Sequence, residues 1–209
     1  EATTASGSIS VADAGGTLTV VAMTAGGAGN VALTTTGSGD VVVDAVTAAG
    51  DAITITAAGA ILEAANGDTV ADLTALTLDL NAVTGIHGAA SLEIDSQQVA
   101  ADTVNGDIDL LNLNTAGGAV AVATLTTGTG AIDFVQAKGN LTIAKAQAAS
   151  GDLTIAGSDG SLAVDDASVT VSGGIAISGS NGSLTVTKAT TASGNISVAN
   201  AAVADLTGR

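Results

Sequence analysis

Residues 139–164 read GNLTIAKAQAASGDLTIAGSDGSLAV, and this stretch decides the fold. It holds three copies of one phrase, in which Gly is followed by a small or polar residue, an aliphatic residue, another small or polar residue and a second aliphatic residue. The phrase alternates with a period of two, which is typical of a β-strand with one buried and one solvated face. The leading Gly permits a turn with positive φ before each strand.

The same phrase recurs along most of the chain. Its clear copies begin at Gly7, Gly16, Gly29, Gly39, Gly106, Gly118, Gly130, Gly139, Gly151, Gly160, Gly182 and Gly194. Alternate copies lie 21 or 22 residues apart, as Gly118 and Gly139 or Gly160 and Gly182 do. A fixed period of this length predicts a solenoid, in which each residue lies above its equivalent in the preceding coil.

We therefore expect an all-β chain that folds as a parallel β-helix, or solenoid, with about 21 residues and two main strands per coil and roughly ten coils. An antiparallel β-sandwich is the alternative, but a sandwich needs no fixed period and its core usually carries aromatic residues. This chain has one Phe and neither Trp nor Tyr. The side chains expected to point inward include Ile9, Val11, Leu141, Ile143, Leu153, Ile155, Leu184, Val186, Ile196 and Val198.

Composition excludes several classes of partner. The 209 residues carry a formal net charge of −16, with only Lys138, Lys145, Lys188 and Arg209 as cations. Such a chain cannot neutralise a run of phosphates, so nucleic acid and anionic membrane surfaces are not expected as partners. No apolar stretch approaches the roughly 18 residues of a membrane helix, so membrane insertion is not expected. The absence of Cys excludes disulfides and thiolate metal sites.

A longer repeat is superimposed on the short one. Residues 2–12 return as residues 189–199 with a single difference, Ser8 against Asn195. We interpret residues 1–209 as a single solenoid segment and as one period of a longer tandem array. Copies or neighbouring repeats are expected to stack end to end, with the coil at residues 2–12 able to follow the one at 189–199.

The middle of the chain carries the most specific pattern. It comprises residues 59–63 (GAILE), 71–80 (ADLTALTLDL), 85–88 (GIHG), 91–93 (SLE) and 105–110 (NGDIDL). This order resembles the β-helical repeat region of giant bacterial surface and secreted adhesins related to filamentous haemagglutinin. The resemblance implies a right-handed parallel β-helix, an extracellular or cell-surface location, and a role in an extended stalk or adhesive filament that possibly contacts cell-surface or matrix glycans.

Catalytic patterns are not found in the sequence. His87 is the only His, no Gly-x-Ser-x-Gly motif accompanies it, and we interpret Gly85-Ile86-His87-Gly88 as a turn. The carboxylate pairs Asp165-Asp166 and Asp107 with Asp109 raise the alternative of a polysaccharide-active enzyme. Without an aromatic sugar platform we favour a solvated, charged surface instead, and expect no enzymatic activity.

Acidic residues in phase with the coil predict a cation site. Asp51, Asp72 and Glu93 are spaced by 21 residues, so in a 21-residue coil they would stack about 4.8 Å apart. Like charges at that spacing repel by roughly 1 kcal/mol per pair in water. Calcium, which accepts several carboxylate oxygens, is the cofactor that we hypothesise for these three residues, although the calcium repeat Gly-Gly-x-Gly-x-Asp is absent.

Outward Thr residues leave a further alternative open. Thr-x-Thr segments such as Thr17-Leu18-Thr19 and Thr185-Val186-Thr187 are typical of ice-binding solenoids, and a polar face of this kind also fits a carbohydrate-binding surface. The ranks are expected to be broken, because Thr142 is followed one coil later by Ala163. Thr also favours strand surfaces for conformational reasons alone.

Overall fold

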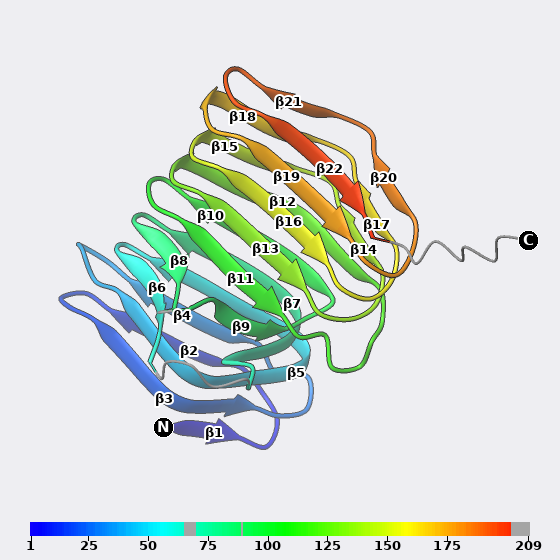
Figure 1. The fold of residues 1–209 in the computed structure, drawn as a ribbon. Coiled ribbons are helices and arrows are strands. Elements are labelled where there is room, and N and C mark those ends of the chain that lie inside the picture. Colours follow the sequence, from blue (N-terminus) through cyan, green and yellow to red (C-terminus); the bar gives the residue numbers. More distant parts are fainter. Residues whose placement is uncertain (65–69, 89, 202–209) are drawn as a thin grey trace, which may run out of the picture.

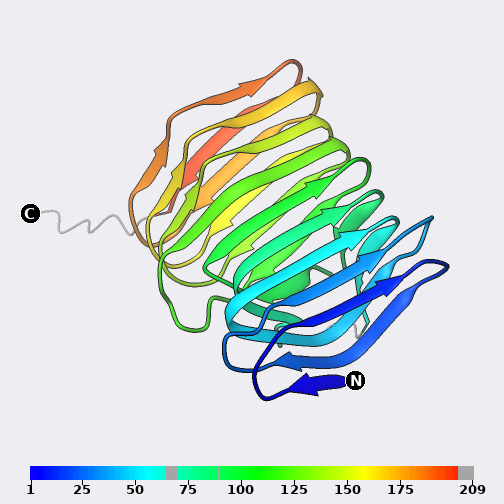
Figure 2. The same cartoon turned by 180° about the vertical axis from the view of Figure 1, so that it is seen from behind.

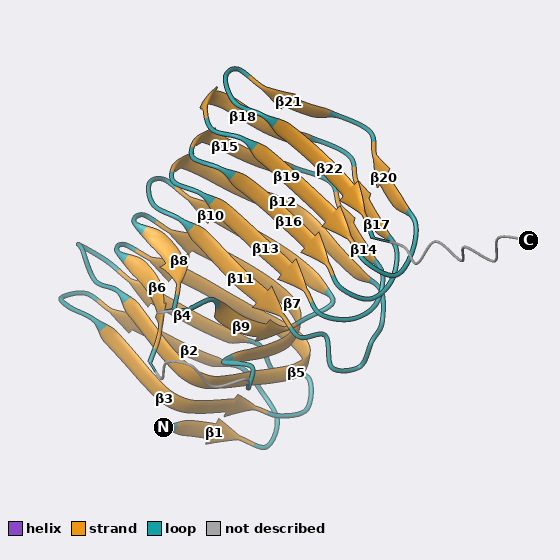
Figure 3. Ribbon diagram, in the orientation of Figure 1, coloured by secondary structure: helices purple, strands orange, loops and turns teal. Residues whose placement is uncertain are grey.

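The computed structural model describes residues 1–64, 70–88 and 90–201. Within these ranges there are 22 β-strands and no helix (Figures 1 and 3). The strands are β1 (Ala2–Thr4), β2 (Ile9–Asp13), β3 (Leu18–Ala25), β4 (Val31–Thr35), β5 (Val41–Ala57), β6 (Ala60–Glu63), β7 (Leu73–Ala82), β8 (Gly85–His87), β9 (Leu92–Asp95), β10 (Gln98–Thr103), β11 (Ile108–Asn112), β12 (Val120–Thr129), β13 (Ile132–Gln136), β14 (Leu141–Ile143), β15 (Ala146–Ser150), β16 (Leu153–Gly157), β17 (Leu162–Val164), β18 (Ala167–Ser172), β19 (Ile175–Gly179), β20 (Leu184–Val186), β21 (Ala189–Thr191) and β22 (Ile196–Asn200).

The strands form a parallel β-solenoid, as the sequence predicts. Each strand pairs with the strand that occupies the same side of the next coil, so β14 pairs with β17 and β17 with β20. In this column Leu141 lies beside Leu162, and Leu162 beside Leu184. The stack has about nine turns, with β1 at one end and β20 to β22 at the other (Figures 1 and 2).

Each of the last three coils has three strands rather than the two main strands expected. The additional strand is the Ala-rich or Thr-rich segment of β15, β18 and β21, which no Gly-led phrase announces. Its inward residues are small, and Ala146, Ala148 and Ala167 are fully buried. Small side chains let this side lie close to the other two, which explains why the strand has no aliphatic signal in the sequence.

Coil length varies more than the expected value of 21 residues. Leu141 and Leu162 are 21 residues apart, whereas Ile61 and Ile86, which occupy one column, are 25 apart. The additional residues lie at corners and at ladder irregularities, such as the one between Ala48 and Ala52. Local bulges of this kind leave the inward columns intact, because pairing resumes in register on each side.

The core consists of aliphatic columns with a single aromatic residue. Phe134 is fully buried between Leu110 and Ile155 in neighbouring coils. The ten expected inward residues follow a gradient towards the ends of the stack. Leu141, Ile143, Leu153 and Ile155 are buried, and Ile9, Val11, Leu184 and Val186 are partly buried against the core.

The expected burial is wrong for Ile196 and Val198, which are 46% and 49% exposed. Both lie in the same columns as the buried Ile175 and Ile177. Their strand, β22, pairs on only one side within the described residues, so nothing described covers its outer edge.

Polar residues that follow the turn glycines link successive coils. Asn140 Oδ1 accepts a hydrogen bond from the Ser161 amide at 2.9 Å, one coil away. Asp107 Oδ1 does the same for Ala131 at 2.7 Å. Asp152 Oδ1 accepts from the Gly174 amide at 2.7 Å. Part of the acidic excess therefore satisfies backbone donors at the corners, where the strand ladders are interrupted.

The turn glycines themselves are stacked. Gly151 has φ +113°, and a Cβ atom there would lie 2.1 Å from the carbonyl oxygen of Gly130 in the preceding coil. Only a residue without a side chain fits both the backbone conformation and the coil spacing. This requirement explains why the phrase begins with Gly in nearly every copy.

Candidate functional site

Three buried carboxylates meet in the N-terminal half of the stack. Glu63 comes from β6, Asp72 directly precedes β7, and Glu93 comes from β9. One carboxylate oxygen of each lies within 4.8 Å of the others. The exposed fractions are 8% for Glu63, 2% for Asp72 and 5% for Glu93, so all three groups are largely withdrawn from solvent. We call this group the carboxylate cluster.

The solenoid register brings the cluster together. Glu63 occupies the column position of the fully buried Val43 in the preceding coil, so its side chain replaces an inward aliphatic one. The Asp72 amide donates to the Glu93 carbonyl at 2.9 Å, and the Glu93 amide donates to Asp72 Oδ2 at 3.3 Å. Gly88 leaves room for the carboxylate, since a Cβ atom there would lie 2.2 Å from Glu63 Oε2.

The structure brings Asp72 and Glu93 together, as their spacing predicts, but it places Asp51 elsewhere. Asp51 lies in β5 at the irregularity between Ala48 and Ala52, where pairing with β7 changes register. Glu63 takes its place in the cluster. Sequence reasoning missed Glu63 because it assumed a uniform 21-residue coil. The available signal was the phrase GAILE at residues 59–63, in which an acid replaces the second inward aliphatic residue.

The cluster concentrates negative charge in a part of the chain that is poor in cations. No Lys or Arg precedes Lys138 in the sequence, and His87 is the only other side chain that can carry positive charge in that region. Three carboxylates at this separation offer oxygen ligands suited to a hard divalent cation such as calcium. Their chemistry is that of a binding site, because no nucleophile or second type of ligand belongs to the group.

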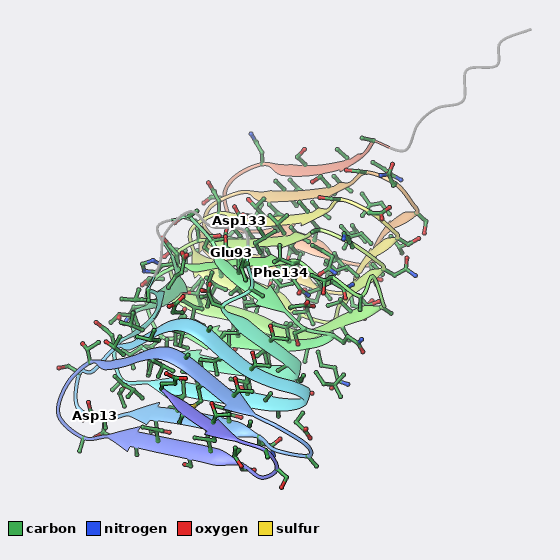
Figure 4. The ribbon with its side chains drawn as sticks, turned by 90° about the horizontal axis from the view of Figure 1, so that it is seen from below. Asp13, Glu93, Asp133 and Phe134 are labelled. Atoms are coloured by element: carbon green, nitrogen blue, oxygen red, sulfur yellow. The ribbon has the colours of Figure 1, made fainter. Side chains whose placement is uncertain are left out.

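A second pair of carboxylates lies on the outer face of the next strands along the chain. Asp109 in β11 stacks beside Asp133 in β13, the residue that precedes the buried Phe134. Figure 4 shows Asp133, Phe134 and Glu93 in the middle of the stack, far from Asp13 at its N-terminal end. Burial, and then the neighbouring Asp109 carboxylate, raise the pKa of Asp133 above its ordinary value of 3.8.

The remaining candidate catalytic residues have structural roles. His87 belongs to strand β8 and not to a turn, and its Nδ1 lies 3.1 Å from the Gly88 carbonyl oxygen. The turn interpretation is therefore wrong, because Ile86 completes a column with Ile61 and Ile108 and draws its neighbours into the ladder. Asp166, one of the paired acids, forms an ion pair with Lys188 Nζ at 3.1 Å.

An unbroken file of polar side chains runs along one face of the solenoid. Consecutive coils contribute one member each, and the register links them in a single column. We call this the polar file: Thr34, Thr56, Asn81, Asp102, Thr126, Gln147, Ser168 and Thr190. Within it the Thr126 hydroxyl donates to Asp102. The ranks through Thr142 and Thr154 are broken by Ala163 and Ala176, as expected.

A shallow groove of about 440 Å³ lies beside the polar file, across β7, β10, β12 and β14. Its floor includes Ala100, Ala121 and Ala123, and Thr77 and Gln98 lie along it. A register irregularity between Val99 and Ala100 creates the hollow, because Ala100 pairs with Thr124 and the small Ala123 is left over. The groove is therefore a consequence of small side chains at a bulge.

No helix in the described ranges is long and apolar enough to cross a membrane. Comparison of the chain with protein-family models, with curated protein sequences and with solved structures finds no match.

Proposed function

We propose that this chain is a structural and interaction module, a segment of an extracellular β-helical stalk or filament of the kind found in bacterial adhesins. The observation that carries the proposal is the continuous parallel ladder, in which side chains of the same class recur from coil to coil over about nine turns. At a strand spacing of about 4.8 Å this stack is roughly 43 Å long. A rod of this kind can hold a binding element away from a cell or form the fibre itself.

The lateral surface supports a passive role better than a catalytic one. The candidate acids that we located cap backbone amides, as Asp107 does, or form an ion pair, as Asp166 does. The proposal therefore includes no enzymatic activity. Turnover of a polysaccharide by the purified chain, abolished by Asp109→Asn, would contradict it.

Two measurements test the proposed role. Small-angle X-ray scattering of the chain should give an elongated particle whose length grows in proportion when tandem copies are joined genetically. Antibodies against the chain should label intact source cells, and external protease should remove the label. A particle that stays compact in the tandem protein, or a label found only after lysis, would refute a stalk at the cell surface.

The polar file favours a second candidate, a carbohydrate-binding or ice-binding face. It presents hydroxyl, amide and carboxylate groups on eight consecutive coils, next to the shallow groove. Such groups bind polyhydroxylated ligands by hydrogen bonding. Glycan-array binding and inhibition of ice recrystallisation test the two ligands. Thr56→Val and Thr126→Val should weaken whichever activity is found, whereas Thr185→Val, outside the file, should not.

The carboxylate cluster supports calcium as a stabilising ligand of the stalk. Calcium accepts flexible sets of oxygen ligands, and extracellular modules bind it with modest affinity. Its role here would be to bridge successive coils, because Glu63, Asp72 and Glu93 belong to different coils or precede different strands.

A further inference from the structure

The strands at each end of the stack pair on one side only within the described part of the chain. At the N-terminal end β1 pairs with β3, and β2 with β4. At the other end β21 pairs with β18, and β22 with β19. These two pairs lie at opposite ends of the solenoid (Figures 1 and 2). Each end thus presents a row of backbone N–H and C=O groups along the stack axis, which is a template for another parallel strand.

The two end surfaces carry the same residues in the same order. β1 and β21 both read Ala-Thr-Thr, and residues 9–12 and 196–199 both read Ile-Ser-Val-Ala. The connecting corners have equal length and contain a glycine with positive φ, +113° at Gly7 and +128° at Gly194. The backbone therefore follows the same path on these two sides at both ends.

We propose that a second copy of this chain stacks on the first, with its β1 on β21 and its β2 on β22 in parallel register. This inference rests on the proposed stalk function and deepens it by naming the partner. The register continues the existing columns, with Ile9 above Ile196 and Val11 above Val198. The two exposed side chains of β22 would then be enclosed, as Ile175 is in the coil below, where only 2% of its surface is exposed.

Charge complementarity singles out a second copy as the occupant. In this register Glu1 of the second copy stands above Lys188, which already pairs with Asp166 below at 3.1 Å. The column then alternates negative, positive and negative. At the far end of the same contact Asp13 stands above Asn200, so the carboxylate faces an amide donor rather than another charge.

The contact is heterologous and leaves both outer ends of the pair available. A translation along the axis joins the C-terminal end of one copy to the N-terminal end of the next, so the pairing does not close on itself. It generates a filament, in which each copy adds roughly 43 Å for about nine turns.

The test compares two Val→Lys variants of the complete chain by sedimentation equilibrium over a hundredfold concentration range. Val198→Lys places a charge in the end surface. Val171→Lys is the matched control, because Val171 is a similarly exposed strand residue on the side of the stack. Circular dichroism and cooperative unfolding verify that both variants fold.

We expect the wild-type mass to rise with concentration above 19.5 kDa, and Val171→Lys to behave identically. Val198→Lys should remain monomeric, with association reduced at least tenfold. Electron micrographs of the wild type should show rods in multiples of about 43 Å. A wild type that stays monomeric, or association that Val198→Lys leaves intact, overturns the stacking. Loss of association in both variants would indicate side-by-side contact and also overturns it. A monomeric rod in scattering would leave the stalk function standing.

Discussion

Neutralising one carboxylate of the cluster should stabilise the fold and remove its response to calcium. Glu63→Gln is the informative change, because Gln keeps the size and hydrogen-bonding capacity of Glu without its charge. Two like-charge interactions disappear with it, one with Asp72 and one with Glu93. All three groups are more than nine-tenths buried, so solvent screens these interactions less than it would on the surface.

The magnitude follows from the separation of the ligand oxygens. Two unit charges 4.8 Å apart repel by roughly 3 to 4 kcal/mol at an effective dielectric constant of about 20. Local contacts and relaxation offset most of this, so we expect Glu63→Gln to gain about 1–3 kcal/mol in calcium-free buffer. A cation present at a hundred times its dissociation constant contributes about 2.7 kcal/mol to the wild type. For a chain of this size that corresponds to a rise in the unfolding midpoint of about 5–10 °C.

Thermal unfolding in calcium and in chelator, at matched ionic strength, measures both effects. The wild type should melt higher in calcium. Glu63→Gln should melt higher than the wild type in chelator and respond little to calcium. Asp51→Asn is the matched control, since Asp51 lies outside the cluster and its variant should keep the full calcium response. An unchanged wild-type midpoint in calcium, together with a neutral or destabilising Glu63→Gln, would refute the reasoning.

Three further predictions concern the fold. Because the pKa of Asp133 is raised in the folded state, its contribution to stability is complete below about pH 4 and is lost as the pH rises through that value. Asp133→Asn, which also ends the repulsion with Asp109, should therefore raise the urea midpoint near pH 7 but not near pH 3. Gly151→Ala should cost about 2 kcal/mol or more in urea unfolding, owing to its positive φ and the carbonyl 2.1 Å from the added Cβ. Gly15→Ala, where the space is open, should cost under about 1 kcal/mol, and equal losses would contradict the stacked-turn explanation. Phe134→Ala should cost about 3–5 kcal/mol and Phe134→Leu under about 1.5 kcal/mol, and a neutral Phe134→Ala would mean that the central column is not closely packed.

The candidate site was only partly predictable. The spacing of 21 residues correctly placed Asp72 beside Glu93, because these two residues lie in coils of that length. It failed for Asp51, because the coil between β5 and β7 contains additional residues at a corner. A corner can absorb a few residues without disturbing the columns, so its length has no periodic signature in the sequence.

The sequence by itself determined the parallel solenoid, since both of its signals are local and repetitive. Alternation of aliphatic and polar residues specifies strands, and the Gly-led phrase specifies where each turn begins. Only the tertiary structure decided which acid joins the carboxylate cluster, that β15, β18 and β21 form a third side, and that Asn140 and Asp107 cap the next coil. These features depend on contacts between residues about twenty positions apart whose exact offset varies from coil to coil. Stacking determines that offset, through the fit of each coil on the one below it.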